Sequence, residues 1–126
     1  MSIDLKSISS DKAPAAIGPY SCAIEAHNTV YVSGQLPIRT DGFMPESAKE
    51  QAAQSICNIE HLLRSSGMSL RNVVKTTVFL TNMDDFAQVN EVYGAIFSAP
   101  YPARSCVEVS KLPKGAKVEI ECIAVR

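Results

Sequence analysis

The chain has 126 residues, of which 46% are hydrophobic and 20% charged, and its formal net charge is −1. This length suits a single domain over residues 1–126, and the composition excludes a disordered chain. The small net charge and the lack of any lysine or arginine run argue against a nucleic-acid partner.

The sequence also argues against a membrane or metal-binding protein. No apolar run approaches the roughly 18 residues of a membrane span, and the N-terminal stretch resembles neither a secretory signal nor a transit peptide. We therefore expect a cytoplasmic protein. The cysteines form no CxxC pair and the histidines lack ligand spacing, so free, mostly buried thiols and no metal site are expected. The cysteines are Cys22, Cys57, Cys106 and Cys122.

The first half of the chain predicts a hairpin followed by a helix. Residues 1–19 read as an irregular lead-in, and residues 21–26 and 29–36 as strands joined at His27-Asn28. Ser47 and Glu50 form a capping-box pattern, and Gly67 supplies a C-terminal stop. Between them, apolar residues recur at helical spacing at Ala48, Ala52, Ile56, Ile59 and Leu63.

The second half predicts a strand, a helix and two final strands. Residues 72–80 are rich in β-branched residues. Thr81–Asp85 opens a helix with two aspartates near its positive end. Its apolar stripe is Phe86, Val89, Tyr93 and Phe97, and prolines end it. Strands are expected over residues 103–110 and 117–125.

The resulting order, ββαβαββ, predicts an α+β domain of two layers, with both helices on one face of a single sheet. The other face would be uncovered and would carry Arg104, Cys106, Glu119 and Glu121 beside apolar side chains. Such a face is typical of a subunit interface. We therefore expect a homo-oligomer with sites between its subunits.

Arg104 and the two late glutamates are the first candidates for chemistry. Alternation along two strands expected to be neighbours would bring Arg104 to the same side as Glu119 and Glu121. A guanidinium is suited to bidentate capture of a carboxylate, and a glutamate can orient a water or move a proton. Arg104 could equally form a structural salt bridge to either glutamate. The pattern does not choose between Glu119 and Glu121.

Three further residues are candidates with structural alternatives. Tyr20 follows the Gly18-Pro19 turn and could hydrogen-bond a ligand or pack in the core. Ser33 precedes Gly34, where the backbone can approach a ligand, although a strand can simply end there. Cys106 lies beside Arg104 on the pattern, but no histidine is placed to activate it, so thiol catalysis is not expected.

The ordered set of motifs resembles the RidA (YjgF) family of reactive-intermediate deaminases. The resemblance runs from residue 13 to the C-terminus. Its landmarks are Ala13-Pro-Ala-Ala-Ile-Gly-Pro-Tyr-Ser21, Val32-Ser-Gly-Gln35, Val74-Lys-Thr-Thr-Val-Phe-Leu80, Asp85-Phe86 with Val89-Asn90, Pro102-Ala-Arg-Ser-Cys-Val-Glu-Val109 and Val118-Glu-Ile-Glu-Cys-Ile-Ala124. Cys22 departs from the glutamine found in many members and affects only fine specificity.

The resemblance implies a chorismate-mutase-like fold, a homotrimer with clefts between subunits, and hydrolysis of 2-imino acids and their enamine tautomers to 2-keto acids and ammonia without a cofactor. It assigns carboxylate binding to Arg104 and the water to Glu119, which resolves the choice against Glu121. The other matching positions are Tyr20, which would assist proton movement, and the substrate-binding residues Ser33, Asn90 and Cys106. Two alternatives are endoribonuclease or translation-inhibitor activity, and a non-enzymatic module that binds small carboxylates or acts like a chaperone.

Overall fold

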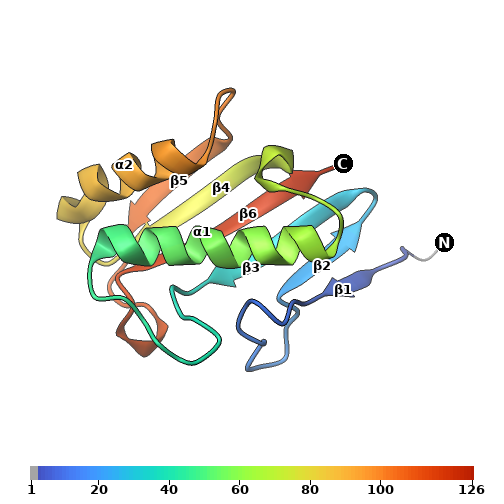
Figure 1. Ribbon diagram of the computed structural model, residues 1–126, viewed down its shortest axis with the longest axis horizontal. Coiled ribbons are helices and arrows are strands. Elements are labelled where there is room, and N and C mark those ends of the chain that lie inside the picture. The colour runs from blue at the N-terminus through green and yellow to red at the C-terminus, as the bar shows by residue number, and fades with distance from the viewer. Residues whose placement is uncertain (1–2) are drawn as a thin grey trace.

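Six strands form one sheet in the structure, a computed structural model that describes residues 3–126 (Figure 1). Their order across the sheet is β1-β2-β3-β6-β4-β5. Strands β4 and β5 run parallel, and the other neighbouring pairs are antiparallel. The elements are β1 (Lys6–Ile8), β2 (Ala23–Ala26), β3 (Thr29–Gln35), α1 (Ala48–Ser65), β4 (Val73–Leu80), α2 (Phe86–Ile96), β5 (Ala103–Glu108) and β6 (Val118–Val125).

The predicted order of elements is confirmed except for strand β1. The sequence predicts an irregular segment over residues 1–19, but Lys6–Ile8 pair with β2 at the edge of the sheet. Residues 1 and 2 of that segment lie outside the described part of the chain. Only Ile8 of β1 is buried. Three residues with one inward side chain are too short for a detectable alternation.

The hairpin of β2 and β3 turns at His27 and Asn28, as predicted. These two residues have φ values of 51° and 59°. Positive φ at both central positions is typical of a two-residue turn whose twist matches the flanking strands. The turn sets the register in which Val32 is buried while Tyr31 lies on the opposite face.

Helix α1 begins and ends where the sequence predicts. The Ser47 Oγ accepts a hydrogen bond from the Glu50 N–H at 3.1 Å, and the Ser47 hydroxyl donates to the Glu50 carboxylate at 3.1 Å. Gly67 follows the helix with φ of 79°, a conformation typical of a helix end. The buried side of α1 runs along its whole length and consists of Ala48, Gln51, Ala52, Ser55, Ile56, Asn58, Ile59, Leu62 and Leu63.

Helix α2 begins later than predicted. The segment from Thr81 instead forms a 3-10 turn over Met83–Asp85, capped by the Asn82 side chain, which accepts a hydrogen bond from the Asp84 N–H at 2.9 Å. The α-helix starts at Phe86. The aspartates therefore belong to the turn that leads into the helix, and the apolar stripe of α2 faces the core from its first turn onward.

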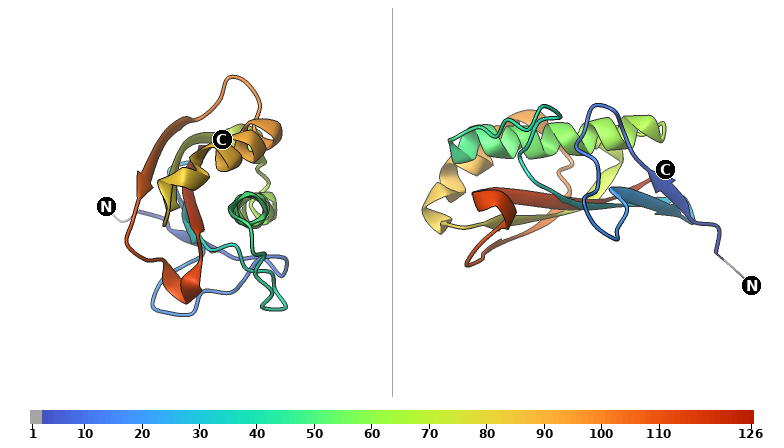
Figure 2. Two further views of the ribbon diagram at one scale, coloured as in Figure 1. Left: turned by 90° about the vertical axis from the view of Figure 1, so that its left-hand side faces the viewer. Right: turned by 90° about the horizontal axis from the view of Figure 1, so that it is seen from below.

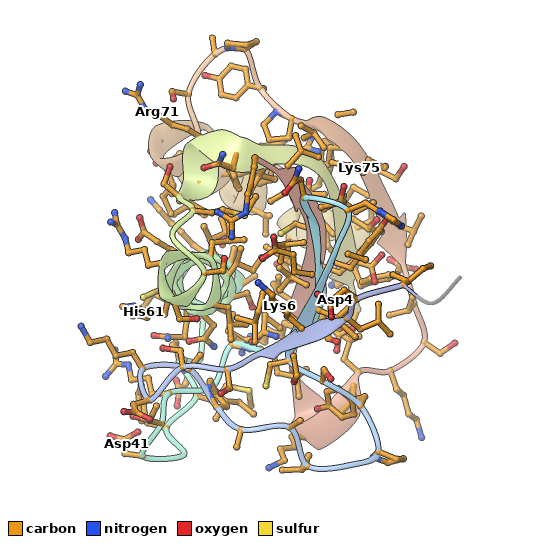
Figure 3. All side chains as sticks on the ribbon, turned by 90° about the vertical axis from the view of Figure 1, so that its right-hand side faces the viewer. Asp4, Lys6, Asp41, His61, Arg71 and Lys75 are labelled. Carbon is orange, nitrogen blue, oxygen red and sulfur yellow. The ribbon has the colours of Figure 1, made fainter. Side chains whose placement is uncertain are left out.

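Both helices pack on one face of the sheet, as predicted (Figure 2). We call this side the helix face and the other side the open face. The core lies between helices and sheet, and strand residues on the helix face are almost fully buried: Val30, Val32, Val78, Leu80, Val118, Ile120 and Ala124. On the open face, Lys75 donates a hydrogen bond to the Ser105 hydroxyl at 2.9 Å. Figure 3 shows Lys75 across the sheet from His61 of α1.

Candidate active site

Strand β4 lies between β5 and β6, so the strands that carry Arg104 and Glu119 are not neighbours. The prediction that they pair with each other is wrong. Each pairs instead with β4, β5 in parallel and β6 antiparallel. Residues opposite each other in register share a face of the sheet. The β4 partners of Arg104 and Glu119 therefore show on which face each of them lies.

Arg104 lies on the helix face. It is opposite Thr76, which is fully buried beneath the helices and is itself opposite the buried Cys122. The Arg104 Nη1 donates a hydrogen bond to the Asn90 Oδ1 of α2 at 2.7 Å. The prediction that Arg104 shares the uncovered face with Glu119 and Glu121 is therefore wrong. Its side chain points toward α2.

Two aromatic rings of α2 lie against the Arg104 guanidinium. Its Cζ is 4.8 Å from the ring centroid of Tyr93 and 5.6 Å from that of Phe86. These distances are typical of cation–π contacts. Together with Asn90, the rings order an arginine side chain that would otherwise sample many rotamers.

A surface hollow of about 400 Å³ opens beside this guanidinium. Its lining residues are Asn90, Tyr93, Gly94, Tyr101, Pro102 and Arg104. None of the ion pairs among residues 3–126 includes Arg104, so the alternative of a salt bridge to Glu119 or Glu121 is wrong. Asn90 accepts from one of the five guanidinium N–H groups. The remaining donors can bind an anion in the hollow.

Cys106 lies two residues beyond Arg104 on the same face, opposite the buried Val78. Burial raises the pKa of its thiol, and the nearby Arg104 charge opposes the rise. A thiol whose pKa is raised is a poor nucleophile at neutral pH. The raised pKa agrees with the expectation that Cys106 is not a catalytic thiol.

Glu119 lies on the open face, opposite Phe79 of β4. Its carboxylate crosses β3 at Gly34, where a Cβ atom would come within 2.6 Å of the Glu119 Oε2. Burial raises the pKa of Glu119, and the neighbouring Glu121 adds to the rise. Glu121 itself is exposed. Glu119 is thus the half-buried carboxylate of the two, and the missing side chain at Gly34 gives it room.

Tyr20 and Ser33 lie near Gly34. The Ser33 hydroxyl donates to the Ser21 carbonyl oxygen at 2.6 Å, which ties the lead-in segment to β3. Tyr20 is 52% exposed. Tyr20 and Gly34 both line a small hollow of about 90 Å³. Tyr20 is therefore accessible to a ligand, and the alternative that it packs in the core is wrong.

The candidate residues fall into two groups on opposite sides of the sheet. The arginine half comprises Arg104, Asn90, Phe86, Tyr93 and Cys106, and the glutamate half comprises Glu119, Gly34, Ser33 and Tyr20. The roles of Phe86, Tyr93 and Gly34 in these groups were not predicted. In the sequence, Phe86 and Tyr93 look like any apolar helix stripe, so nothing marks them as site residues. Gly34 could have been recognised, because a glycine inside a strand often marks a close approach of another group.

Two features lie outside both groups: a surface hollow, and a contact on α1 between the Cys57 Sγ and the His61 Nε2 at 3.4 Å. The hollow, of about 690 Å³, lies near the C-terminal ends of both helices, and none of the candidate residues lines it. Within residues 3–126, no three His, Cys, Asp or Glu side chains are placed to hold a metal ion. Over the same residues, neither helix is long and apolar enough to cross a membrane.

The chain matches one family model, described as endoribonuclease L-PSP, over residues 10–126. It is 46% identical over 125 residues to the 2-iminobutanoate/2-iminopropanoate deaminase of Escherichia coli K12, with 96% of this chain and 98% of that protein covered.

Solved structures agree with the same family and fold. The crystal structure of RidA from the Antarctic bacterium Psychrobacter sp. PAMC 21119 is 48% identical, with a TM-score of 0.93 over 96% of this chain and 99% of that one. The Escherichia coli protein TdcF, crystallised with bound serine, is 43% identical, with a TM-score of 0.92 over 96% and 98% of the two chains. The predicted α+β, chorismate-mutase-like fold is confirmed, and the chain belongs to the RidA family.

Proposed function

We propose that this protein hydrolyses 2-imino acids and their enamine tautomers, such as 2-iminobutanoate and 2-iminopropanoate, to 2-keto acids and ammonia. The observation that carries the proposal is the Arg104 guanidinium, which is ordered in a hollow and has no carboxylate partner among residues 3–126. The 46% identical relative named for this reaction supports the same chemistry here.

Arg104 binds the substrate carboxylate in this proposal. A guanidinium and a carboxylate form two parallel charge-assisted hydrogen bonds, each contributing roughly 1.5–3 kcal/mol. Asn90 and the two rings fix the guanidinium before the substrate arrives, which reduces the entropy lost on binding. The serine bound to TdcF is itself a small amino acid with a carboxylate, which agrees with a carboxylate-binding site in this family.

The active site is shared between subunits of a homotrimer in this proposal. Arg104 faces the helices and Glu119 faces the open side, so a small imino acid held by one chain's arginine half cannot reach its glutamate half. A second copy that supplies the glutamate half completes the site. Three copies related by a threefold axis close such head-to-tail contacts into a ring.

Glu119 holds and polarises the attacking water. The water oxygen adds to the C=N carbon while the carboxylate accepts a water proton, and the nitrogen takes up a proton to give a carbinolamine. The C–N bond then breaks as the hydroxyl proton passes to the nitrogen, which releases ammonia and leaves the 2-keto acid. Tyr20 or solvent carries protons between these groups. Positioning supplies most of the acceleration because the imine is already electrophilic.

We further infer a cytoplasmic protein. The four cysteines are free thiols, two of them buried. Reduced thiols are typical of reducing compartments.

A coupled assay tests the proposed function. Threonine and a threonine dehydratase generate 2-iminobutanoate, and the protein should accelerate release of 2-oxobutanoate. Replacing Arg104 with alanine removes a two-bond clamp, so Arg104→Ala should lower kcat/KM at least about 100-fold while circular dichroism stays unchanged. Arg71→Ala is the matched control, because Arg71 is exposed and lines neither of the hollows beside Arg104 and Tyr20. Undiminished turnover by Arg104→Ala would refute the assignment.

The same preparations separate the alternative functions. A carboxylate-binding module would bind 2-oxobutanoate but leave the rate of imine hydrolysis unchanged. The matching family model is described as an endoribonuclease. The net charge of −1 argues against that activity here, because it provides little attraction for RNA, a polyanion. Cleavage of single-stranded RNA by the Arg104→Ala variant, at the rate of the wild type, would favour a nuclease over the deaminase.

A further inference from the structure

Tyr93 is held in one orientation where α2 meets the sheet. Its hydroxyl lies 2.7 Å from the Thr76 Oγ1, and Thr76 is fully buried in β4. Its ring packs against Phe97 with the centroids 4.5 Å apart. Tyr93 is only 5% exposed. A contact at the hydroxyl and another on the ring fix both ends of the side chain.

This fixed ring is also a contact surface for Arg104. The Arg104 Cζ lies 4.8 Å from the Tyr93 centroid. Thr76, which anchors the Tyr93 hydroxyl, is the residue opposite Arg104 in the parallel pair of β4 and β5. The backbone from which the arginine extends and the anchor of the ring are therefore adjacent in one rigid sheet.

The buried hydroxyl pair is not needed to fill space. A valine and a phenylalanine would occupy the same volume, and replacing both partners of a buried hydrogen bond with apolar groups of the same shape costs little stability. The pair does fix the orientation of the ring, because a phenylalanine in this position would have no anchor at its far end.

We propose that Tyr93, anchored by Thr76, is the positioning residue that holds the Arg104 guanidinium in the orientation that binds the substrate carboxylate. The proposal rests on the proposed function. Asn90 fixes one N–H of the same guanidinium, and Phe86 supplies a more distant second ring. Tyr93 acts through Arg104, so its loss weakens carboxylate binding rather than removing a group that reacts.

The double variant Thr76→Val/Tyr93→Phe tests this role because it removes the pair without leaving an unpaired buried hydroxyl. Its thermal unfolding midpoint should stay close to that of the wild type. The Kd for 2-oxobutanoate, measured by calorimetry, and the KM for 2-iminobutanoate should each rise about fivefold, the size of one net hydrogen bond, with a smaller change in kcat. Thr29→Val is the matched control, since the Thr29 hydroxyl bonds only the His27 carbonyl in the β2–β3 turn.

The positioning role is overturned if the double variant binds 2-oxobutanoate as tightly as the wild type. If the double variant does not fold, the single variant Tyr93→Phe tests the role through the same Kd for 2-oxobutanoate and KM for 2-iminobutanoate. The proposed function fails separately: a wild type that binds 2-oxobutanoate but does not accelerate imine hydrolysis refutes the deaminase, while the binding constants still test the role of Tyr93.

Discussion

The Glu119 carboxyl group is half-buried beside a second carboxylate. Burial is the larger cause of its raised pKa, and the charge of Glu121 is the smaller. The native state therefore holds the Glu119 proton more tightly than the unfolded chain does. Between the ordinary glutamate pKa and the raised one, stability falls as the pH rises. A group that costs stability at neutral pH and lies in a candidate site is typical of a catalytic acid or base.

Replacing Glu121 with glutamine tests this coupling. In the proposed mechanism Glu119 acts as a carboxylate, so kcat/KM should fall on the acid side as the pH drops through its raised pKa. The Glu121→Gln substitution removes one cause of the rise, so the acid limb of the profile should move to lower pH. Glu46→Gln, an exposed carboxylate in the loop before α1, should leave the limb in place. A limb that does not move in Glu121→Gln contradicts the coupling.

Gly34 has a steric role that a single methyl group can test. In Gly34→Ala the new Cβ would lie 2.6 Å from the Glu119 Oε2 and 2.7 Å from its Cδ, so the carboxylate must turn away. The side chain is flexible, so the fold should survive while kcat/KM falls at least about tenfold, because a displaced carboxylate no longer holds the water.

A double-variant comparison provides the control for Gly34. Glu119→Gln already lacks the carboxylate, so adding Gly34→Ala to it should cause little further loss of kcat/KM. Losses that multiply instead would show that Gly34 acts on turnover independently of Glu119.

At the scale of elements, local sequence patterns predicted the helices and strands but not which strands pair with each other in the sheet. The α1 boundaries followed from Ser47, Gly67 and the helical spacing between them, which are properties of adjacent residues. Alternation also assigned Arg104 and Cys106 to one face of their strand and Glu119 and Glu121 to one face of theirs. The relation between those faces depends on β4, which lies between the two strands, and no local pattern encodes that pairing.

The same limit applies to the candidate site. The residue types suggested carboxylate binding by Arg104 and a water or proton role for either late glutamate, and only the family resemblance chose Glu119. The contact of Tyr93 with Arg104, by contrast, joins a helix to a strand. A helical stripe predicts that an aromatic residue is buried and does not predict which charged group lies against it.

Asn58 of α1 fixes the chain segment that follows β3. Its side-chain amide donates to the Leu36 and Ile38 carbonyl oxygens, both at 3.0 Å, and the residue is fully buried. Asn58→Leu keeps the volume and leaves both carbonyls without this donor, so the free energy of unfolding should fall by about 2–3 kcal/mol in urea titrations. Arg64→Leu on the same helix loses an exposed ion pair with Glu60 and should cost less than about 1 kcal/mol. Equal losses would contradict the assignment.

At the scale of the whole molecule, one sheet face is covered by helices and the other is not (Figure 2). The open face carries exposed apolar side chains on three strands: Tyr31, Val107 and Val125. It also carries Glu119, the carboxylate that the arginine half of the same chain lacks. An exposed apolar face that also carries a candidate catalytic residue is typical of an interface with another copy of the chain. Assembly and activity should therefore be lost together.

Val107 tests that link. It lies on the open face of β5 and is 42% exposed, so Val107→Asp introduces a charge where we expect contact with another copy. Sedimentation equilibrium should show the wild type as a trimer and the variant as smaller species, with kcat/KM reduced in proportion to the loss of trimer. Leu5→Asp is the matched control, because Leu5 is 58% exposed beside β1, at the sheet edge opposite β5. A Val107→Asp protein that dissociates and keeps full activity would place the whole active site within one chain. That result would contradict the proposed site shared between subunits, which follows from Arg104 and Glu119 lying on opposite faces of the sheet.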